Sequence, residues 1–160
     1  MPLNRGKQMS DRTLDLREIK KNTLNTIANT EIEQSNIHGF GLFAKNKIYR
    51  DQVLTLLDGQ VLSMTDYKRI QNGWVDSGAE LLKYFFMECN YIDSERILAR
   101  AFRTKYSYIN HSRTPNTAIS YFPIKLVTIV DILPGEELTI DYRKEKLSEA
   151  YCSRPDKKFL

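Results

Sequence analysis

Residues 134–142, Pro134-Gly135-Glu136-Glu137-Leu138-Thr139-Ile140-Asp141-Tyr142, contain the run that decides the fold. Taken alone, this run predicts a Pro-Gly turn that leads into an edge strand with a tyrosine at its end. Two further strand candidates, residues 117–122 and 124–130, come directly before it. From Thr30 onward, short apolar runs alternate with turn residues, which predicts a mainly β or α+β domain.

Two other segments concentrate polar residues or glycines where a strand would be apolar. Asn110-His111-Ser112, with Pro115-Asn116, follows an apolar pair and predicts either an Asx or serine turn beside a core histidine, or a binding site. Residues 38–44 read HGFGLFA, so two glycines flank Phe40. Glycines let a backbone approach a ligand closely, although such pairs also occur in plain turns.

Together and in this order, the three segments resemble the SET-domain family of S-adenosylmethionine-dependent protein-lysine methyltransferases. The blocks NHSRTPN and GEELTIDY carry the resemblance, which covers residues 30–143. It implies a β-clip fold of small curved sheets, in which a C-terminal pseudoknot brings the two blocks together and sets Tyr142 beside Asn110. Residues 1–29 are then an N-terminal helical extension, and residues 144–160 are a tail like a post-SET segment.

The resemblance also implies roles for individual residues. Tyr142 and Asn110 are the expected catalytic residues. The expected cofactor-binding residues, for S-adenosylmethionine and its product S-adenosylhomocysteine, are Gly39, Phe40, Gly41, Tyr84, Asn110, His111 and Tyr142. Tyr84 is as readily interpreted as an ordinary core aromatic residue. The expected lysine channel is lined by Leu57, Ile119, Ile140 and Tyr151.

A tyrosine and an apolar channel suit methyl transfer to lysine. A lysine with its reference pKa of about 10.4 is protonated at neutral pH, and exposing its lone pair costs roughly 4.6 kcal/mol. Desolvation and the positive sulfonium of the cofactor both lower that pKa. The Tyr142 hydroxyl is expected to orient the amine or the departing methyl group, and no metal is required.

Several positions depart from the family pattern. Arg113 stands where many members have a zinc-binding cysteine, and the chain has two cysteines, Cys89 and Cys152, so no metal site is expected. Closure of the lysine channel then falls to Tyr151 or Phe159 in the tail. Ile140 and Leu57 replace residues that carry hydroxyls in many members, which favours di- or trimethylation.

Helices are predicted at two places. Residues 10–28 show rough helical spacing of apolar residues, and a short helix over residues 66–71 is capped by Ser63 or Thr65 and ends at Asn72-Gly73. The aromatic stretch over residues 79–93 predicts a buried helix or a strand pair.

Composition limits the class of protein. The chain has 160 residues, 41% of them apolar and 28% charged, which fits one globular domain with a sizeable core. No long apolar run or signal peptide occurs, so we expect an intracellular protein, cytoplasmic or nuclear, with delivery into another cell left open. The formal net charge is +4, and residues 96–113 hold five basic residues and no acidic one.

Two functions remain open at this stage. The first is methyl transfer from S-adenosylmethionine to a lysine of a protein, with a histone as one candidate substrate. The second is a catalytically silent SET module that binds chromatin or a protein partner through its basic surface. The basic run over residues 96–113 predicts either a solvated face or a weak contact with nucleic acid or a nucleosome.

Overall fold

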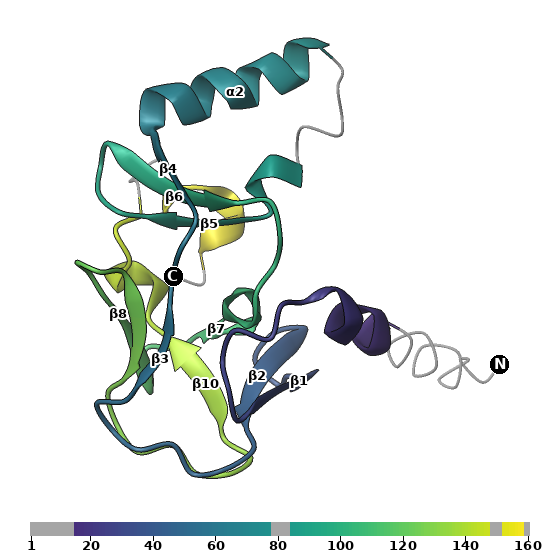
Figure 1. The fold of residues 1–160 in the computed structure, drawn as a ribbon, viewed down its shortest axis with the longest axis vertical. Helices are drawn as coiled ribbons and strands as arrows, with labels where there is room; N and C mark the ends of the chain where they lie inside the picture. Colours follow the sequence, from purple (N-terminus) through teal and green to yellow (C-terminus); the bar gives the residue numbers. More distant parts are fainter. Residues whose placement is uncertain (1–14, 78–83, 148–151, 159–160) are drawn as a thin grey trace, which may run out of the picture.

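The computed structural model describes residues 15–77, 84–147 and 152–158. Within them, the chain forms one seven-stranded and one three-stranded sheet, with α2 (Met64–Ser77) beside the smaller one (Figure 1). The larger sheet comprises β1 (Thr30–Gln34), β2 (Phe40–Ala44), β3 (Val53–Leu56), β7 (Asn110–His111), β8 (Thr117–Ser120), β9 (Lys125–Thr128) and β10 (Glu137–Ile140). The smaller sheet comprises β4 (Gln60–Ser63), β5 (Glu88–Tyr91) and β6 (Arg96–Arg100). Short 3₁₀ helices occupy η2 (Lys105–Tyr108), η3 (Tyr142–Lys144) and η4 (Pro155–Lys157).

The decisive strand, β10, lies inside the larger sheet. It pairs antiparallel with β2 on one side, and parallel with β7 and β8 on the other. The edge strand predicted from its sequence alone is therefore wrong, because neighbours from three distant segments surround it. Leu138 and Ile140 are almost fully buried, as a strand with partners on both sides requires.

Asn116 explains why an asparagine ends the NHSRTPN block. Its side-chain amide donates to the Glu137 carbonyl over 2.7 Å, and its side-chain oxygen accepts from the Thr139 N–H over 2.8 Å. The side chain thus takes the place of a backbone peptide along β10, where β7 has ended and β8 has not begun. The Thr117 hydroxyl continues this pattern by donating to the Thr139 carbonyl. These contacts join the two motif blocks, and the predicted mainly β domain of small sheets is confirmed.

The β1–β2 hairpin carries the HGFG segment. Its register runs from Thr30 opposite Ala44 to Gln34 opposite Phe40. The connecting turn is closed by the Ser35 N–H, which donates to the Gly39 carbonyl over 2.9 Å. Gly39 has φ +52°, a conformation that glycine adopts without the penalty other residues incur. The first glycine of the segment is therefore required by the turn.

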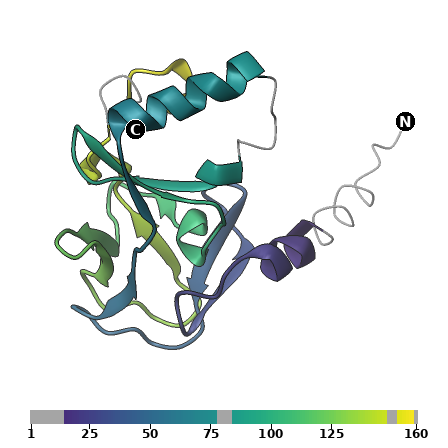
Figure 2. The same cartoon turned by 45° about the horizontal axis from the view of Figure 1, so that its top comes forward.

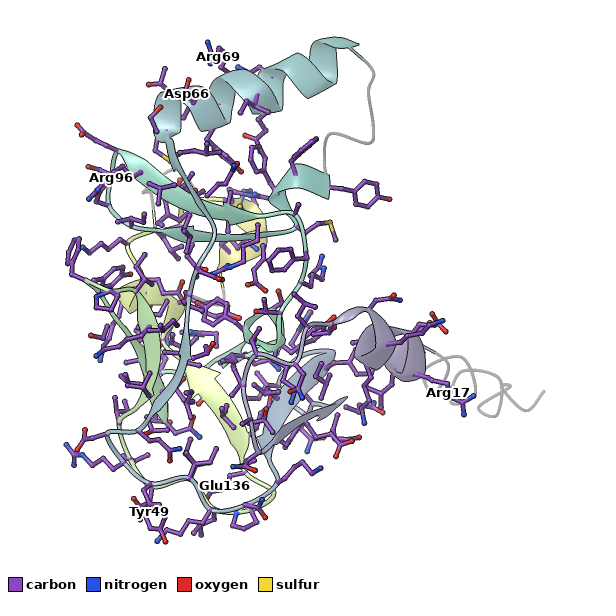
Figure 3. All side chains as sticks on the ribbon, viewed as in Figure 1. Arg17, Tyr49, Asp66, Arg69, Arg96 and Glu136 are labelled. Carbon is purple, nitrogen blue, oxygen red and sulfur yellow. The ribbon has the colours of Figure 1, made fainter. Side chains whose placement is uncertain are left out.

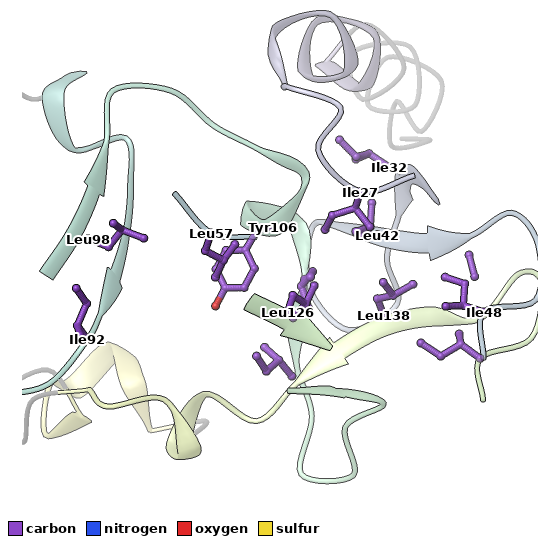
Figure 4. Packing of buried hydrophobic residues seen from close by; sticks show 14 residues of the cluster. Ile27, Ile32, Leu42, Ile48, Leu57, Ile92, Leu98, Tyr106, Leu126 and Leu138 are labelled. Carbon is purple, nitrogen blue, oxygen red and sulfur yellow. The ribbon is translucent and has the colours of Figure 1, made fainter. Parts of the chain in front are cut away.

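The core lies between the curved sheets (Figure 4). Ile27, Leu42 and Leu138 are fully buried, and so are Leu126 and Ile132. Ile27 precedes the first strand, so the segment ahead of β1 is packed into the same core. The Lys105 ammonium fixes this segment by donating to the carbonyls of Ile27 and Thr30.

The helices differ in extent from those expected. Residues 15–22 are helical and residues 10–14 lie outside the described residues, while the expected end at residue 28 is wrong because Leu24 instead pairs with Thr104. Ser63 does cap α2, since its hydroxyl oxygen accepts from the Asp66 N–H. The helix continues past Gly73 to Ser77 and lies across the smaller sheet (Figure 2).

The aromatic stretch over residues 79–93 is only partly described. Residues 84–86 form a single 3₁₀ turn that leads into β5, and residues 79–83 fall in the undescribed range. None of the helices in the described ranges combines the length and hydropathy needed to cross a bilayer.

Candidate active site

The three motif segments meet at the side chain of Asn110. Its amide nitrogen lies 2.7 Å from Glu137 Oε1, 3.2 Å from the His38 carbonyl and 3.3 Å from the Phe40 carbonyl. These contacts join the HGFG segment, the NHS block and β10 at one point. The Asn110 side chain thus contacts the backbone around Phe40 directly, a contact that the sequence did not predict.

Ser35 and Glu137 complete this junction, and sequence reasoning did not identify them. The Ser35 hydroxyl donates to the Glu137 carboxylate over 2.8 Å, and its oxygen accepts from the Ile37 N–H over 2.9 Å. Glu137 lies inside the GEELTIDY block and Ser35 lies three residues before His38, but 102 positions separate the two along the chain. Only the pairing of β10 with β2 brings them together.

Gly41 is required for a different reason from Gly39. A Cβ added at Gly41 would lie 2.1 Å from Glu137 Oε1 and 3.1 Å from the Ser35 Cβ, well inside van der Waals contact. The Glu137 side chain therefore occupies the space that any larger residue at position 41 would need. Sequence reasoning assigned both glycines to close approach of a ligand, whereas at Gly41 the close approach is made by a carboxylate of the same chain.

Tyr142 lies against the two neighbours of Asn110. Its hydroxyl donates to the Ile109 carbonyl over 2.6 Å, and its N–H donates to His111 Nδ1 over 3.1 Å. The rings of Tyr142 and His111 are 5.3 Å apart between centroids. The tyrosine is thus fixed at both its hydroxyl and its backbone, and it lies next to the NHS block as expected.

Asp141 stabilises the turn that carries Tyr142. The Arg143 guanidinium donates to both of its carboxylate oxygens, at 2.8 and 2.7 Å, and the Arg143 N–H donates to Oδ1. Asp141 is 2% exposed. The hydrogen bonds from Arg143 lower the pKa of Asp141 to about 2, so the carboxylate stays ionised throughout the physiological range.

A cleft of about 1130 Å³ opens beside Tyr142. Its wall combines aromatic, cationic and acidic side chains with the apolar Ile109 and Ile97; they include Tyr67, Tyr91, Tyr106, Tyr142, Lys68, Arg103, Arg154, Glu88, Asp93 and Glu145. Among the expected cofactor-binding residues, Tyr142 lines this cleft, while Gly39, Phe40, Gly41, Tyr84, Asn110 and His111 are absent from its wall. The cleft therefore extends from Tyr142 toward the smaller sheet.

A second cavity of about 140 Å³ lies on another side of η3. Ile119 and Ile140, both expected in the lysine channel, line it together with Asp141 and Glu145. Leu57 is buried in the core instead and lines neither cavity, with its N–H donating to the Ile124 carbonyl. The fourth expected channel residue, Tyr151, lies outside the described residues.

Tyr84 begins the 3₁₀ turn ahead of β5. Its side chain is half exposed, and it borders neither the larger cleft nor the smaller cavity. Its assignment to the cofactor or to the core stays a prediction. The stretch that precedes it, residues 78–83, lies outside the described residues.

The basic run over residues 96–113 does not form a continuous exposed face. Arg100 is buried and pairs with Glu88 over 2.7 Å, while the Lys105 ammonium donates to backbone carbonyls. Arg96 is exposed but pairs with Asp93 over 2.7 Å (Figure 3). A contact with nucleic acid stays a prediction. Each of these three basic side chains already makes an ion pair or hydrogen bond within the protein.

No cluster of three or more metal-binding side chains occurs within residues 15–77, 84–147 and 152–158. Cys89 and Cys152 are both free thiols. Burial raises the pKa of Cys89 to about 11, so this thiol is protonated at neutral pH.

Comparison with known proteins agrees with this geometry. The family model described as SET domain matches residues 39–143. The chain is also 31% identical over 136 residues to the histone-lysine N-methyltransferase TRX1 of Oryza sativa subsp. japonica. That alignment covers 76% of this chain and 12% of the much longer relative. The motif junction at Asn110 and the match over residues 39–143 lead to one conclusion: this chain belongs to the SET-domain family.

Proposed function

We propose that this SET domain transfers methyl groups from S-adenosylmethionine to the side-chain amine of a lysine in a protein. The observation that carries the proposal is the fixed position of Tyr142, which contacts Ile109 and His111 and lines the large cleft. The rice relative is a histone-lysine N-methyltransferase by name, which makes histones the first substrates to test.

The residues of the cleft fit the cofactor in size and chemistry. S-adenosylmethionine carries a carboxylate, an ammonium group and an adenine ring, and it requires partners for all three. Arg103 and Lys68 supply cations for the carboxylate, and Tyr67 and Tyr91 supply aromatic surface for the adenine. A volume of about 1130 Å³ exceeds what a ligand of this size needs.

Asn110 adds a second point of fit. Its amide nitrogen is taken up by the junction, whereas its side-chain oxygen accepts no hydrogen bond from the described residues. Such an oxygen is suited to accept from the ammonium group of the cofactor. Together with backbone groups of Gly39, Phe40 and His111, it extends the proposed binding set beyond the wall of the large cleft, which none of these four residues lines. Tyr142 links the two parts, because it lines the cleft and its N–H donates to His111 Nδ1. When bound, the cofactor supplies an electrophilic methyl group on a positively charged sulfur.

Tyr142 has the role of orienting the amine. Its hydroxyl donates to the Ile109 carbonyl over 2.6 Å, and a phenolic oxygen is by its chemistry also an acceptor for an N–H such as that of the lysine amine. A tyrosine held at both ends loses little conformational freedom on binding, so the alignment of the amine is established in advance. The absence of the hydroxyl would leave the amine without this partner.

Ile119 and Ile140 set the expected number of methyl groups. Both line the small cavity with hydrocarbon, so they offer no hydroxyl to hold a water beside the amine. Hydrocarbon at these two positions accommodates a methylated amine, which favours di- or trimethylation. Mass spectrometry of the modified lysine tests this directly, and a product that remains monomethylated would contradict it.

The test of function compares the wild type with Tyr142→Phe. Each protein is incubated with radiolabelled S-adenosylmethionine and a mixture of protein targets that includes histones, and cofactor binding is measured separately by calorimetry. We expect label transfer by the wild type, its loss in Tyr142→Phe, and cofactor binding by both. Cofactor binding without transfer to any target would instead favour the silent binding module.

A further inference from the structure

Glu145 is shared between the walls of the two cavities. Among the described residues, Glu145 alone lines both the large cleft and the small cavity. The Tyr106 hydroxyl donates to Glu145 Oε1 over 2.9 Å, while no described residue donates to Oε2. One oxygen of the carboxylate is thus held by the protein, and the other is available to a ligand.

Aromatic rings surround this carboxyl group. Tyr106 and Tyr142 line the large cleft with it, and the Tyr106 ring packs between Leu57 and Leu126 (Figure 4). Burial raises the pKa values of Tyr106 and Tyr121, and the nearby Glu145 charge raises them further. A carboxylate in such surroundings attracts an alkylammonium ion through its charge and through charge-assisted hydrogen bonds.

We propose that the Glu145 carboxylate binds the ammonium group of the target lysine and accepts a proton from it. This inference rests on the proposed function and adds a catalytic residue to it. In the step, an N–H bond of the ammonium breaks, an O–H bond forms at Glu145 Oε2, and the electron pair of the N–H bond stays on nitrogen. The proton then passes to water in the cleft, which regenerates the carboxylate.

The surroundings of Glu145 suit this exchange. Burial raises the pKa of Glu145 to about 7, although the hydrogen bond from Tyr106 opposes the rise. A carboxyl group with this pKa takes up and releases a proton near neutral pH, where an ordinary glutamate stays ionised. The titratable rings around it are Tyr106, Tyr121 and Tyr142, and its charged neighbours in the chain are Asp141, Lys144 and Lys146.

Two of the charged neighbours of Glu145 have partners of their own within the protein. Asp141 is engaged by the Arg143 guanidinium, and Lys146 lies over the Tyr121 ring at 4.3 Å. Lys144 lines the small cavity and adds a positive charge to its wall. Glu145 Oε2 therefore accepts no hydrogen bond from a described residue, and it belongs to the described residue that lines both cavities.

The test uses a mimic of the lysine side chain, n-butylammonium chloride, and its uncharged counterpart n-butanol. The full chain is labelled with ¹³C at the glutamate carboxyl carbon, and the Glu145 signal, assigned with Glu145→Gln, is followed by NMR across pH. We expect a titration midpoint near neutral pH that n-butylammonium lowers and n-butanol leaves in place. In Glu145→Gln, the affinity for n-butylammonium should fall about tenfold or more.

Glu136→Gln is the matched control. Glu136 is an exposed glutamate at the start of β10, at the opposite end of the molecule from Arg96 (Figure 3), and it lines neither cavity. Its replacement should leave binding of n-butylammonium unchanged. Tyr106→Phe, which removes the hydroxyl that holds Oε1, should shift the Glu145 midpoint upward.

Two results would overturn the inference. One is n-butylammonium binding equally to the wild type and Glu145→Gln; the other is a Glu145 signal that the probe leaves unmoved. Methyl transfer by Glu145→Gln with the wild-type rate and pH profile would refute the inference while the proposed function stands. Binding of the probe at Glu145, without transfer to any protein, would refute the function while the ammonium site stands.

Discussion

Replacing Gly41 by alanine tests the junction of the three motif segments. The new Cβ would lie 2.1 Å from Glu137 Oε1 and 2.6 Å from its carboxyl carbon, so the Glu137 side chain has to rotate away. That movement breaks the hydrogen bonds that the Glu137 carboxylate accepts from Asn110 and Ser35. The substitution therefore acts through a steric clash at position 41, and the loss of stability comes from the broken hydrogen bonds to the Glu137 carboxylate.

The magnitude follows from those two hydrogen bonds. A hydrogen bond to a charged group contributes about 1.5–3 kcal/mol, and the lower end applies here because Glu137 is half-buried and water replaces part of the loss. Two such bonds amount to roughly 3 kcal/mol, from which the better strand propensity of alanine subtracts about 0.5–1 kcal/mol. We expect Gly41→Ala to lower the free energy of unfolding by about 2 kcal/mol.

The assay is urea denaturation of four proteins: wild type, Gly41→Ala, Glu137→Ala and the double variant. Because Glu137→Ala removes the obstructing carboxylate, Gly41→Ala should cost less than about 0.5 kcal/mol in that background. Gly73→Ala is the matched control, since Gly73 lies in α2 with no atom within 4 Å of an added Cβ. It should stabilise the protein by about 0.5–1 kcal/mol.

Two outcomes would refute the reasoning. Gly41→Ala as stable as the wild type would mean that Glu137 does not occupy the space beside Gly41. An equal cost in the Glu137→Ala background would mean that the strain comes from the backbone or from Ser35, whose Cβ lies 3.1 Å from the added atom. The double-variant cycle separates these cases because it isolates the interaction between positions 41 and 137.

Three further predictions concern stability. Arg100→Ala should lower the free energy of unfolding, measured by chemical denaturation, by about 3–5 kcal/mol, because it leaves the buried Glu88 carboxylate without its partner. Arg96→Ala, at an exposed pair, should lower it by less than about 1 kcal/mol, and equal losses in the two variants would contradict this. The pKa of Asp141 is lowered to about 2, so its contribution of about 1–2 kcal/mol is present above pH 4 and is lost as the pH falls toward 2. Thermal unfolding of Asp141→Asn should lack that loss, and a wild-type profile that stays flat down to pH 2 would count against it. Leu138→Ala, at a fully buried site, should cost about 2–5 kcal/mol, and a loss below 1 kcal/mol would contradict the central place of β10.

The glycines show what local sequence reveals and what it does not. Gly39 lies in a turn with positive φ, and a glycine beside turn residues predicts such a position from local sequence. Gly41 looks the same in the sequence, but the reason for it is the Glu137 side chain, a residue of a distant strand. The backbone conformation that requires Gly39 is set by its neighbours in the chain. The lack of space that requires Gly41 depends on which distant residue packs beside it in the fold.

The basic run illustrates the same distinction with charge. Five basic residues without an acidic one over residues 96–113 predict an exposed positive face. In the fold, Arg100 is paired inside the protein with Glu88 from the neighbouring strand, and Lys105 donates to the segment ahead of β1. The sequence shows how many charged residues a segment contains, but which of them form ion pairs depends on strand register and on packing.

The sequence by itself indicated the family, the two motif blocks and the proximity of Tyr142 to Asn110, because short motifs record requirements of turns and of side chains that reach the nearby backbone. Tertiary structure alone decided the inner position of β10, the Ser35–Glu137–Asn110 cluster and the place of Glu145 between the two cavities. Ser35 and Asn110 are 75 positions apart, and no local propensity encodes a contact at that separation. Such contacts form because strand pairing and burial of the shared apolar core bring distant segments together. Polar groups that are buried beside that core then form hydrogen bonds with one another.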